Sequence, residues 1–214
     1  FGNLLDVYLD AVFFSRLDPL DFAQEGHRVE FENDDSSQPL VFKGVVFNEM
    51  KGAMSSTPSI LWDRLCHELF PSNTYHFNSG GDPEHIPDLS YQELRDFYAE
   101  HYHPSNAIFL TFGDIAAEAH QQVFEASVLR RFEALDRKIE VALETPFTEP
   151  VKAIHPYAVD GEEGIENKTH LVLGWKLGES ADLTAMLEAQ LVASVLMENS
   201  ASPLMHYLET TDRG

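Results

Sequence analysis

The sequence predicts an α+β fold, and three observations support this class. Residues 3–17 and 182–198 repeat apolar side chains at the spacing of one helix face. Residues 27–32 alternate polar and apolar side chains, as a half-buried strand does. Residues 107–112 form a short, nearly all-apolar run, which is typical of a buried strand.

The first predicted helix covers residues 3–17 and ends at Asp18-Pro19, because proline disfavours helical backbone in the residue before it. The strand at 27–32 follows, and the polar cluster at 33–38 forms a loop. A second helix is expected from about Leu40. Its apolar stripe consists of Phe42, Val45, Val46 and Ala53, and Glu49 lies on the same stripe.

A further helix is expected at about 58–69. Residues 71–88 contain three prolines and the pair Gly80-Gly81, which predicts an ordered loop with turns. Ser90 and Glu93 have the spacing of a capping box, so a helix begins there and runs to about His101.

Gly113-Asp114 closes the predicted strand at 107–112. Asp114 is a candidate N-cap for the long helix that follows. The side chains of that segment expected to face inward are Ala119, Val123, Phe124 and Phe132.

Residues 144–166 contain three prolines and an acidic, glycine-containing stretch, and they are the best candidate for a linker. A strand is expected at 169–177, a helix at 182–198 and the start of another helix at 203–208. We interpret the ladder of Leu183, Leu187, Leu191 and Val195 as core rather than as a coiled-coil seam, because it is shorter than three heptads.

The 214 residues carry a formal net charge of −22. Such a field repels phosphate backbones and anionic membranes, so we expect neither a nucleic-acid nor a membrane partner. The excess of acid serves solubility in the first interpretation, and forms an acidic wall that attracts basic peptides in the second. No apolar run approaches the ~18 residues of a membrane span. The single Cys66 excludes an internal disulfide and is interpreted as a small core residue.

Glu49 is the one candidate site residue. An ionised carboxylate on a buried apolar stripe is costly unless a cation, a metal or hydrogen-bond donors meet it. From the stripe alone, an ion pair with Arg or Lys, or a place at the helix margin, is commoner than a metal-ligand role. His101 and His103 are interpreted as helix-end residues, where imidazolium interacts well with the helix dipole, rather than as a chelating pair.

Several stretches together resemble a known family. They are 42–52 with its Asn-Glu-Met-Lys-Gly run, 79–83, 97–106, and Gly113-Asp114. These stretches closely resemble the presequence protease family, a branch of the pitrilysin and insulin-degrading-enzyme group of zinc metallopeptidases. The resemblance runs from about Leu4 to Ile115 and continues more loosely beyond Thr169, where 202–206 is similar to a family position.

The resemblance implies a pitrilysin-type layered domain, with helices packed on a mixed, mostly antiparallel sheet. It implies that residues 1–143 are the C-terminal part of the first, catalytic peptidase domain, 144–166 the linker, and 167–214 the start of a second, related α/β domain. It also implies that Glu49 is the third protein ligand of one catalytic zinc ion, whose two other ligands are the histidines of a His-x-x-Glu-His motif.

No His-x-x-Glu-His motif occurs in these residues, so two His ligands and the general base are expected upstream. We therefore expect a segment of a longer protein that contains no catalytic residue and is inactive alone. The alternatives are a non-catalytic homologue acting as a scaffold or interaction subunit, and an acidic peptide-binding module that works without metal. The implied substrates are unfolded peptides, targeting peptides among them, and the acidic excess favours basic ones. The implied compartment is a bacterial cytoplasm or a mitochondrial or plastid matrix.

Overall fold

The computed structural model describes residues 1–136, 138–159, 161 and 164–212. Three acidic residues of the expected linker, Asp160, Glu162 and Glu163, lie outside this part. The chain divides into two compact units, Phe1–His170 and Leu171–Gly214, and each is considered by itself.

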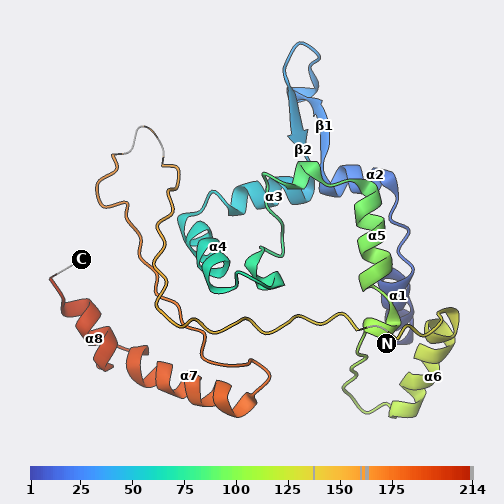
Figure 1. Ribbon diagram of the computed structural model, residues 1–214. Coiled ribbons are helices and arrows are strands. Elements are labelled where there is room, and N and C mark those ends of the chain that lie inside the picture. Colours follow the sequence, from blue (N-terminus) through green and yellow to red (C-terminus); the bar gives the residue numbers. More distant parts are fainter. Residues whose placement is uncertain (137, 160, 162–163, 213–214) are drawn as a thin grey trace. The chain divides into compact units, whose positions relative to one another are not determined.

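The helices of the first unit are α1 (Gly2–Phe13), α2 (Pro19–Asp21), α3 (Val45–Ala53), α4 (Thr57–Leu69), α5 (Tyr91–His101) and α6 (Ala117–Ser127) (Figure 1). A π-helical turn covers Phe22–Gly26, and short 3-10 turns cover Glu32–Asp34, Thr74–His76, Ile86–Asp88, Pro104–Asn106 and Leu129–Arg131. The second unit contains α7 (Leu183–Met197) and α8 (Pro203–Thr210). Across the described part of the chain, no helix combines the length and apolarity that crossing a membrane requires.

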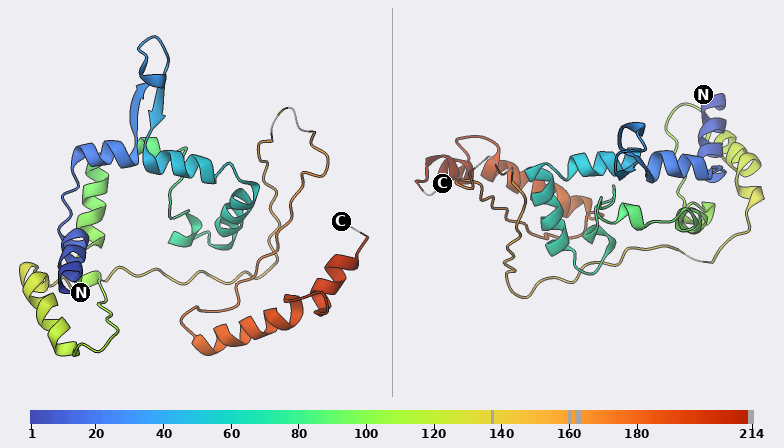
Figure 2. Two further views of the ribbon diagram at one scale, coloured as in Figure 1. Left: turned by 180° about the vertical axis from the view of Figure 1, so that it is seen from behind. Right: turned by 90° about the horizontal axis from the view of Figure 1, so that it is seen from above.

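The core of the first unit lies between α1 and α6, which are side by side in the views of Figure 2. Its buried side chains are Leu9, Phe13, Phe124 and Val128. Aromatic rings extend this core: the ring centroids of Phe13 and Phe109 are 5.7 Å apart, and those of Phe109 and Phe124 are 4.7 Å apart. The prediction that Phe124 faces inward is confirmed.

Two tyrosines of helix α5 form hydrogen bonds with the backbone at the C-terminal end of α1. The Tyr98 hydroxyl donates to the carbonyl of Val12 (2.7 Å) and accepts from the amide of Ser15 (3.0 Å). The Tyr91 hydroxyl donates to the carbonyl of Leu17 at 2.6 Å. These bonds satisfy backbone groups that the end of a helix leaves without intrahelical partners. They also explain why α1 stops at Phe13 and not at residue 17.

The one sheet in the described residues is an antiparallel hairpin of β1 (Arg28–Phe31) and β2 (Leu40–Lys43). Its register pairs Val29 with Phe42 and Phe31 with Leu40, so one face is apolar. On the other face, the Glu30 carboxylate pairs with Lys43 (2.6 Å) and Arg28 (2.7 Å). Their hydrogen bonds lower the pKa of Glu30, that from Lys43 most.

The predicted strand at 27–32 is confirmed, but the prediction of a helix from Leu40 is wrong. Leu40 and Phe42 pair with β1, and helical backbone begins only after Gly44. A Cβ at Gly44 would lie 2.0 Å from the carbonyl oxygen of Gly26. Only glycine allows this close approach, so the chain turns from strand to helix at this residue.

Helix α4, the loop with turns at 71–88 and the capping box of α5 are as predicted. The Ser90 hydroxyl accepts from the Glu93 amide at 3.2 Å, and the Glu93 carboxylate accepts from the Ser90 amide at 2.7 Å. Gly81 in the preceding loop has φ +92°, a conformation that favours glycine.

The predicted strands at 107–112 and 169–177 are not present. Both segments are extended without a partner strand among the described residues, and a strand exists only where its backbone groups pair with a neighbour. Ile108 and Leu110 are almost fully exposed, whereas Phe109 packs on the core. The described fold is therefore mostly helical with one small antiparallel sheet.

The long helix after 113–114 is confirmed in part. Helix α6 begins at Ala117 without a side-chain cap, so the Asp114 cap is wrong. Val123 and Phe124 face the core as expected, and Phe132 packs there from beyond the helix end. Ala119 is exposed, since α6 turns His120 inward instead.

In the second unit, the Asp182 carboxylate caps α7 by accepting from the amides of Thr184 (3.1 Å) and Ala185 (3.0 Å). The predicted helices at 182–198 and 203–208 are confirmed. The interpretation of the leucine ladder as core is wrong for this chain: Leu183 is 74% exposed and Leu191 58%. Periodicity identified the apolar positions, and no described element of this unit covers them.

Candidate metal centre

Glu49, the candidate metal ligand, lies in the middle of α3 with its side chain exposed. Phe47 is the buried residue of this helix. Two residues correspond to about 200° of rotation around an α-helix, so burial of Phe47 turns Glu49 outward. The stripe of Val45, Val46 and Glu49 is a common face as predicted, but this face is open and not buried, because Phe47 takes the inner position.

Two contacts fix the direction of α3. The chain at Gly44 lies against Gly26, as described above, and the Phe47 ring packs on Phe42 with centroids 6.2 Å apart. Phe42 in turn meets the ring of His27 at 6.4 Å. The hairpin and the π-helical turn therefore orient the helix that carries Glu49.

The described residues do not form a metal site by themselves. No group of three or more His, Cys, Asp or Glu side chains that could hold an ion is found among them. The Glu49 carboxylate makes no ion pair or hydrogen bond within the described part, so its oxygens are open to a ligand. A carboxylate suits zinc, but a catalytic zinc takes three protein ligands, and one carboxylate does not make a site.

His101 and His103 have structural contacts. His101 Nδ1 lies 3.0 Å from the carbonyl oxygen of Phe97, one turn back in α5, and its ring stacks on that of Phe97. The Nδ1 atom of His103 accepts from the amide of Ser105 at 3.1 Å and so caps the turn at 104–106. The position of His101 agrees with its interpretation as a residue at a helix C-terminus. His103 lies beyond the end of α5, at the N-terminal end of the next turn, so the interaction with a helix C-terminal dipole does not apply to it.

The loop of Gly80-Gly81 forms the predicted turn, in which the Asp82 carboxylate accepts from the amide of Glu84 at 2.8 Å. It packs beside α3, where the Met54 sulfur is 4.0 Å from Asn78 Nδ2. An open, mostly apolar hollow of about 400 Å³ lies between this loop, α3 and α4. Its lining includes Met50, Met54, Trp62 and Asn78.

Cys66 lies half-buried in α4. Burial, with a smaller contribution from the nearby Asp63 charge, raises the pKa of its thiol. Since the thiolate is the reactive form of cysteine, this environment favours the interpretation of Cys66 as a packing residue.

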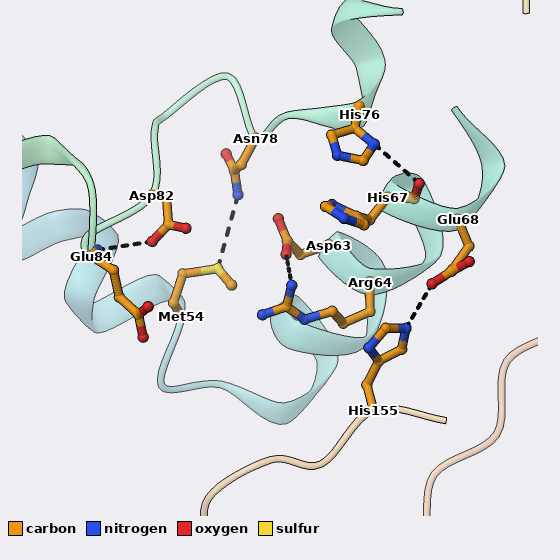
Figure 3. A network of polar contacts seen from close by, with 10 residues as sticks. All are labelled: Met54, Asp63, Arg64, His67, Glu68, His76, Asn78, Asp82, Glu84 and His155. Atoms are coloured by element: carbon orange, nitrogen blue, oxygen red, sulfur yellow. Dashed lines mark hydrogen bonds and ion pairs between the residues drawn. The ribbon is translucent and has the colours of Figure 1, made fainter. Parts of the chain in front are cut away.

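A set of polar contacts around α4 was not foreseen from the sequence (Figure 3). The Glu68 carboxylate lies 2.9 Å from His155 Nε2, although 87 residues separate the two. The Glu144 carboxylate accepts from both the amide and the hydroxyl of Ser72. Exposed Glu, Ser and His residues occur throughout the chain, so nothing in the sequence marks these pairs.

A protein-family model described as the Peptidase M16 inactive domain matches residues 88–213. The matched region begins just before α5 and contains α5, α6, α7 and α8. It starts inside the range 1–143 that the sequence assigned to a catalytic domain.

Similar proteins include presequence proteases and a bacterial protein. The mitochondrial presequence protease of Danio rerio is 43% identical over 207 residues, which is 95% of this chain and 20% of the relative. Presequence protease 1 of Arabidopsis thaliana, chloroplastic/mitochondrial, is 37% identical over 97% of this chain and 19% of its own length. Protein HypA of Clostridium perfringens is 33% identical over 95% of this chain and 21% of its own length. The chain thus spans about a fifth of the length of the curated relatives it matches.

Proposed function

The chain belongs to the M16 peptidase family, and from this premise we propose that it is a segment of a zinc-dependent endopeptidase that degrades unstructured peptides. The observation that carries the proposal is the similarity of nearly the whole chain to presequence proteases of an animal and a plant. The sequence contains no His-x-x-Glu-His motif, and the described residues form no metal site by themselves, so the segment alone is inactive in this proposal.

Glu49 is the zinc ligand that this chain contributes in the proposal. Its carboxylate is exposed on a face shared with Val45 and Val46, and it has no competing partner among the described residues. Two imidazoles from outside these residues complete the ligand set. When bound, zinc polarises a peptide carbonyl and lowers the pKa of a bound water. The task of Glu49 is to contribute negative charge to the metal, while Phe47 and Gly44 hold α3 in orientation.

We further propose the domain division that the resemblance implies. Residues 1–143 complete a layered catalytic domain, 144–166 connect, and 167–214 begin a related domain. The extended segments at 107–112 and 169–177 are then sheet strands whose neighbours lie outside this chain. Their composition supports this, because strands that are apolar on both sides are typical of the middle of a sheet.

The proposed substrates are unfolded peptides, including targeting peptides, as the names of the relatives suggest. The net charge of −22 favours basic peptides by electrostatic attraction. The proposed compartment is a mitochondrial or plastid matrix if the source is eukaryotic, and the cytoplasm if it is bacterial. The relatives come from both groups.

Zinc analysis of the full-length protein tests the ligand assignment. Loss of a direct ligand weakens metal binding more than loss of an outer-shell contact, so Glu49→Gln is expected to reduce zinc affinity by more than about 100-fold. Glu84→Gln, which changes an exposed glutamate in the loop after Gly80-Gly81, is the matched control. Equal zinc content in wild type and Glu49→Gln, after dialysis against a chelator, would refute the assignment.

A second candidate is a non-catalytic homologue that serves as a scaffold or interaction subunit. The match of more than half of the chain to an inactive-domain model favours it. The full-length protein decides between the two. Bound zinc together with cleavage of an unfolded peptide supports the peptidase, whereas a zinc-free protein that binds such a peptide without cleaving it supports the scaffold.

A further inference from the structure

The segment Ala142–His155, here named the α4 strap, overlaps the first half of the predicted linker at 144–166, and it is attached at both ends. At its start, Glu144 and Ala142 meet Ser72 and Asn73, which follow α4. At its end, His155 meets Glu68 inside α4. Figure 3 shows the second attachment, with the strap passing beneath the helix at His155.

The first attachment is a two-point clasp. The Ser72 amide donates to one oxygen of the Glu144 carboxylate at 2.9 Å, and the Ser72 hydroxyl donates to the other at 2.7 Å. The Asn73 amide group adds a longer bond of 3.5 Å to the carbonyl of Ala142. Both attachments involve a carboxylate, and hydrogen bonds to an ionised carboxylate are about twice as strong as neutral ones. The first attachment is the stronger end, because Glu144 accepts two such bonds and Glu68 has one contact.

The second attachment joins two side chains. His155 Nε2 and Glu68 Oε1 are 2.9 Å apart, and each side chain is 35% exposed. Two prolines, Pro146 and Pro150, lie between the attachments and restrict the conformations of the strap when it is free. The entropy lost on docking is correspondingly small.

We propose that the α4 strap is a latch that holds residues 142–155 of the first unit against α4. Beyond it, the Tyr157 hydroxyl donates to the Lys168 carbonyl, so the chain that follows the strap still belongs to the first unit. When the strap opens, about 14 residues are released, with a reach of roughly 45 Å when extended. The strap opens locally, because its contacts with α4 involve none of the buried residues of the α1–α6 core. This inference rests on the contacts of the first unit and is independent of the proposed zinc chemistry.

Limited trypsin digestion of the full-length protein tests the latch, because Lys152 lies inside the strap. A protease must pull a stretch of chain away from its contacts before cleaving it, so the cleavage rate after Lys152 reports opening. Glu144→Ala is expected to raise this rate about 3- to 30-fold, since it removes the clasp. Glu149→Ala, an exposed glutamate in the same strap, is the matched control and is expected to leave the rate unchanged.

Two further measurements keep the outcome clear. His155→Gln is expected to raise the rate by a smaller factor than Glu144→Ala, and hydrogen exchange at the amide of Ser72 is expected to rise in Glu144→Ala while exchange in α1 and α6 stays the same. Equal cleavage rates in wild type and Glu144→Ala would overturn the proposal. So would equal acceleration by Glu149→Ala, or exchange in Glu144→Ala that rises throughout the first unit.

Discussion

Helices α1 and α7 both repeat apolar side chains at helical spacing, but α1 has one apolar face and α7 is apolar around most of its surface, and their surroundings are opposite. Leu9 and Phe13 of α1 are 3% and 8% exposed, because α6 presents Phe124 and Val128 against them. Leu183 and Leu191 of α7 are exposed, although their spacing is as regular. The comparison shows that periodicity gives the apolar face of a helix and not the surface that covers it.

The difference predicts a gradient of stability along the chain. The α1–α6 core removes aromatic and aliphatic area from water, which is the dominant stabilising contribution in folding. Helix α7 keeps its leucines in water, and a 15-residue helix without such packing is marginal. We therefore expect slow amide exchange in α1 and α6 and fast exchange in α7, measured on this 214-residue chain. Equal exchange rates in the three helices would contradict the predicted gradient of stability.

The largest effect is expected for Phe124→Ala. It removes a buried ring that contacts Phe109 and leaves a cavity, which costs about 3–5 kcal/mol of unfolding free energy. Urea denaturation followed by tyrosine fluorescence or circular dichroism measures the change. Phe77→Ala is the control, because that ring is 72% exposed and its loss leaves no buried cavity.

A smaller effect is expected for Tyr98→Phe. It removes the hydroxyl that serves both the half-buried Val12 carbonyl and the exposed Ser15 amide, and each lost hydrogen bond costs about 0.5–1.5 kcal/mol. Exchange of the Ser15 amide should rise. Tyr102→Phe is the matched control, since Tyr102 stacks on Tyr98 and no bond from its hydroxyl is found in the described residues. An effect of Tyr102→Phe as large as that of Tyr98→Phe would contradict the prediction.

A loss of stability of intermediate size is expected when the N-cap of α5 is removed. Ser90→Ala removes the N-cap hydroxyl, which costs about 1 kcal/mol at a helix start. Hydrogen bonds from the Ser90 hydroxyl and amide lower the pKa of Glu93. A carboxyl with a lowered pKa stabilises the fold above its ordinary pKa, and this contribution is lost as the pH falls through the lowered value.

The same variant therefore has a pH dependence of known sign. The stability difference between wild type and Ser90→Ala should be full at pH 7 and shrink as the pH falls below about 4, near the ordinary pKa of Glu. Thermal unfolding across this range measures it. A difference that grows on acidification would show that Glu93 does not contribute as its ionised form.

The smallest effect is expected for Leu187→Ala in α7. Its side chain is 56% exposed, and substitutions at exposed positions usually change stability by less than about 0.5 kcal/mol. Urea denaturation of this 214-residue chain measures the change. In the full-length protein, the same substitution becomes costly if another domain covers α7. A large loss of stability already in the 214-residue chain would show that the leucine ladder is core after all.

The sequence predicted the elements whose signals are local. The capping box of Ser90 and Glu93, the alternation at 27–32 and the helical repeat at 182–198 each involve residues close in the chain, and each element is present. The sequence-based prediction of secondary structure failed where pairing with a strand distant in the chain determines the conformation. Leu40–Lys43 joined β1 instead of α3, and residues 107–112 found no neighbouring strand in the described part.

For the candidate site, the sequence by itself determined that Glu49 shares a helix face with Val45 and Val46, because the 3.6-residue period of a helix fixes that geometry. The tertiary structure decided which face is buried. Phe47 packs against Phe42, and Gly44 fits against Gly26, so Glu49 points outward. The tertiary structure also decided the contacts of the α4 strap, since they join residues 69 to 87 positions apart, and a local sequence pattern contains no signal for such pairs.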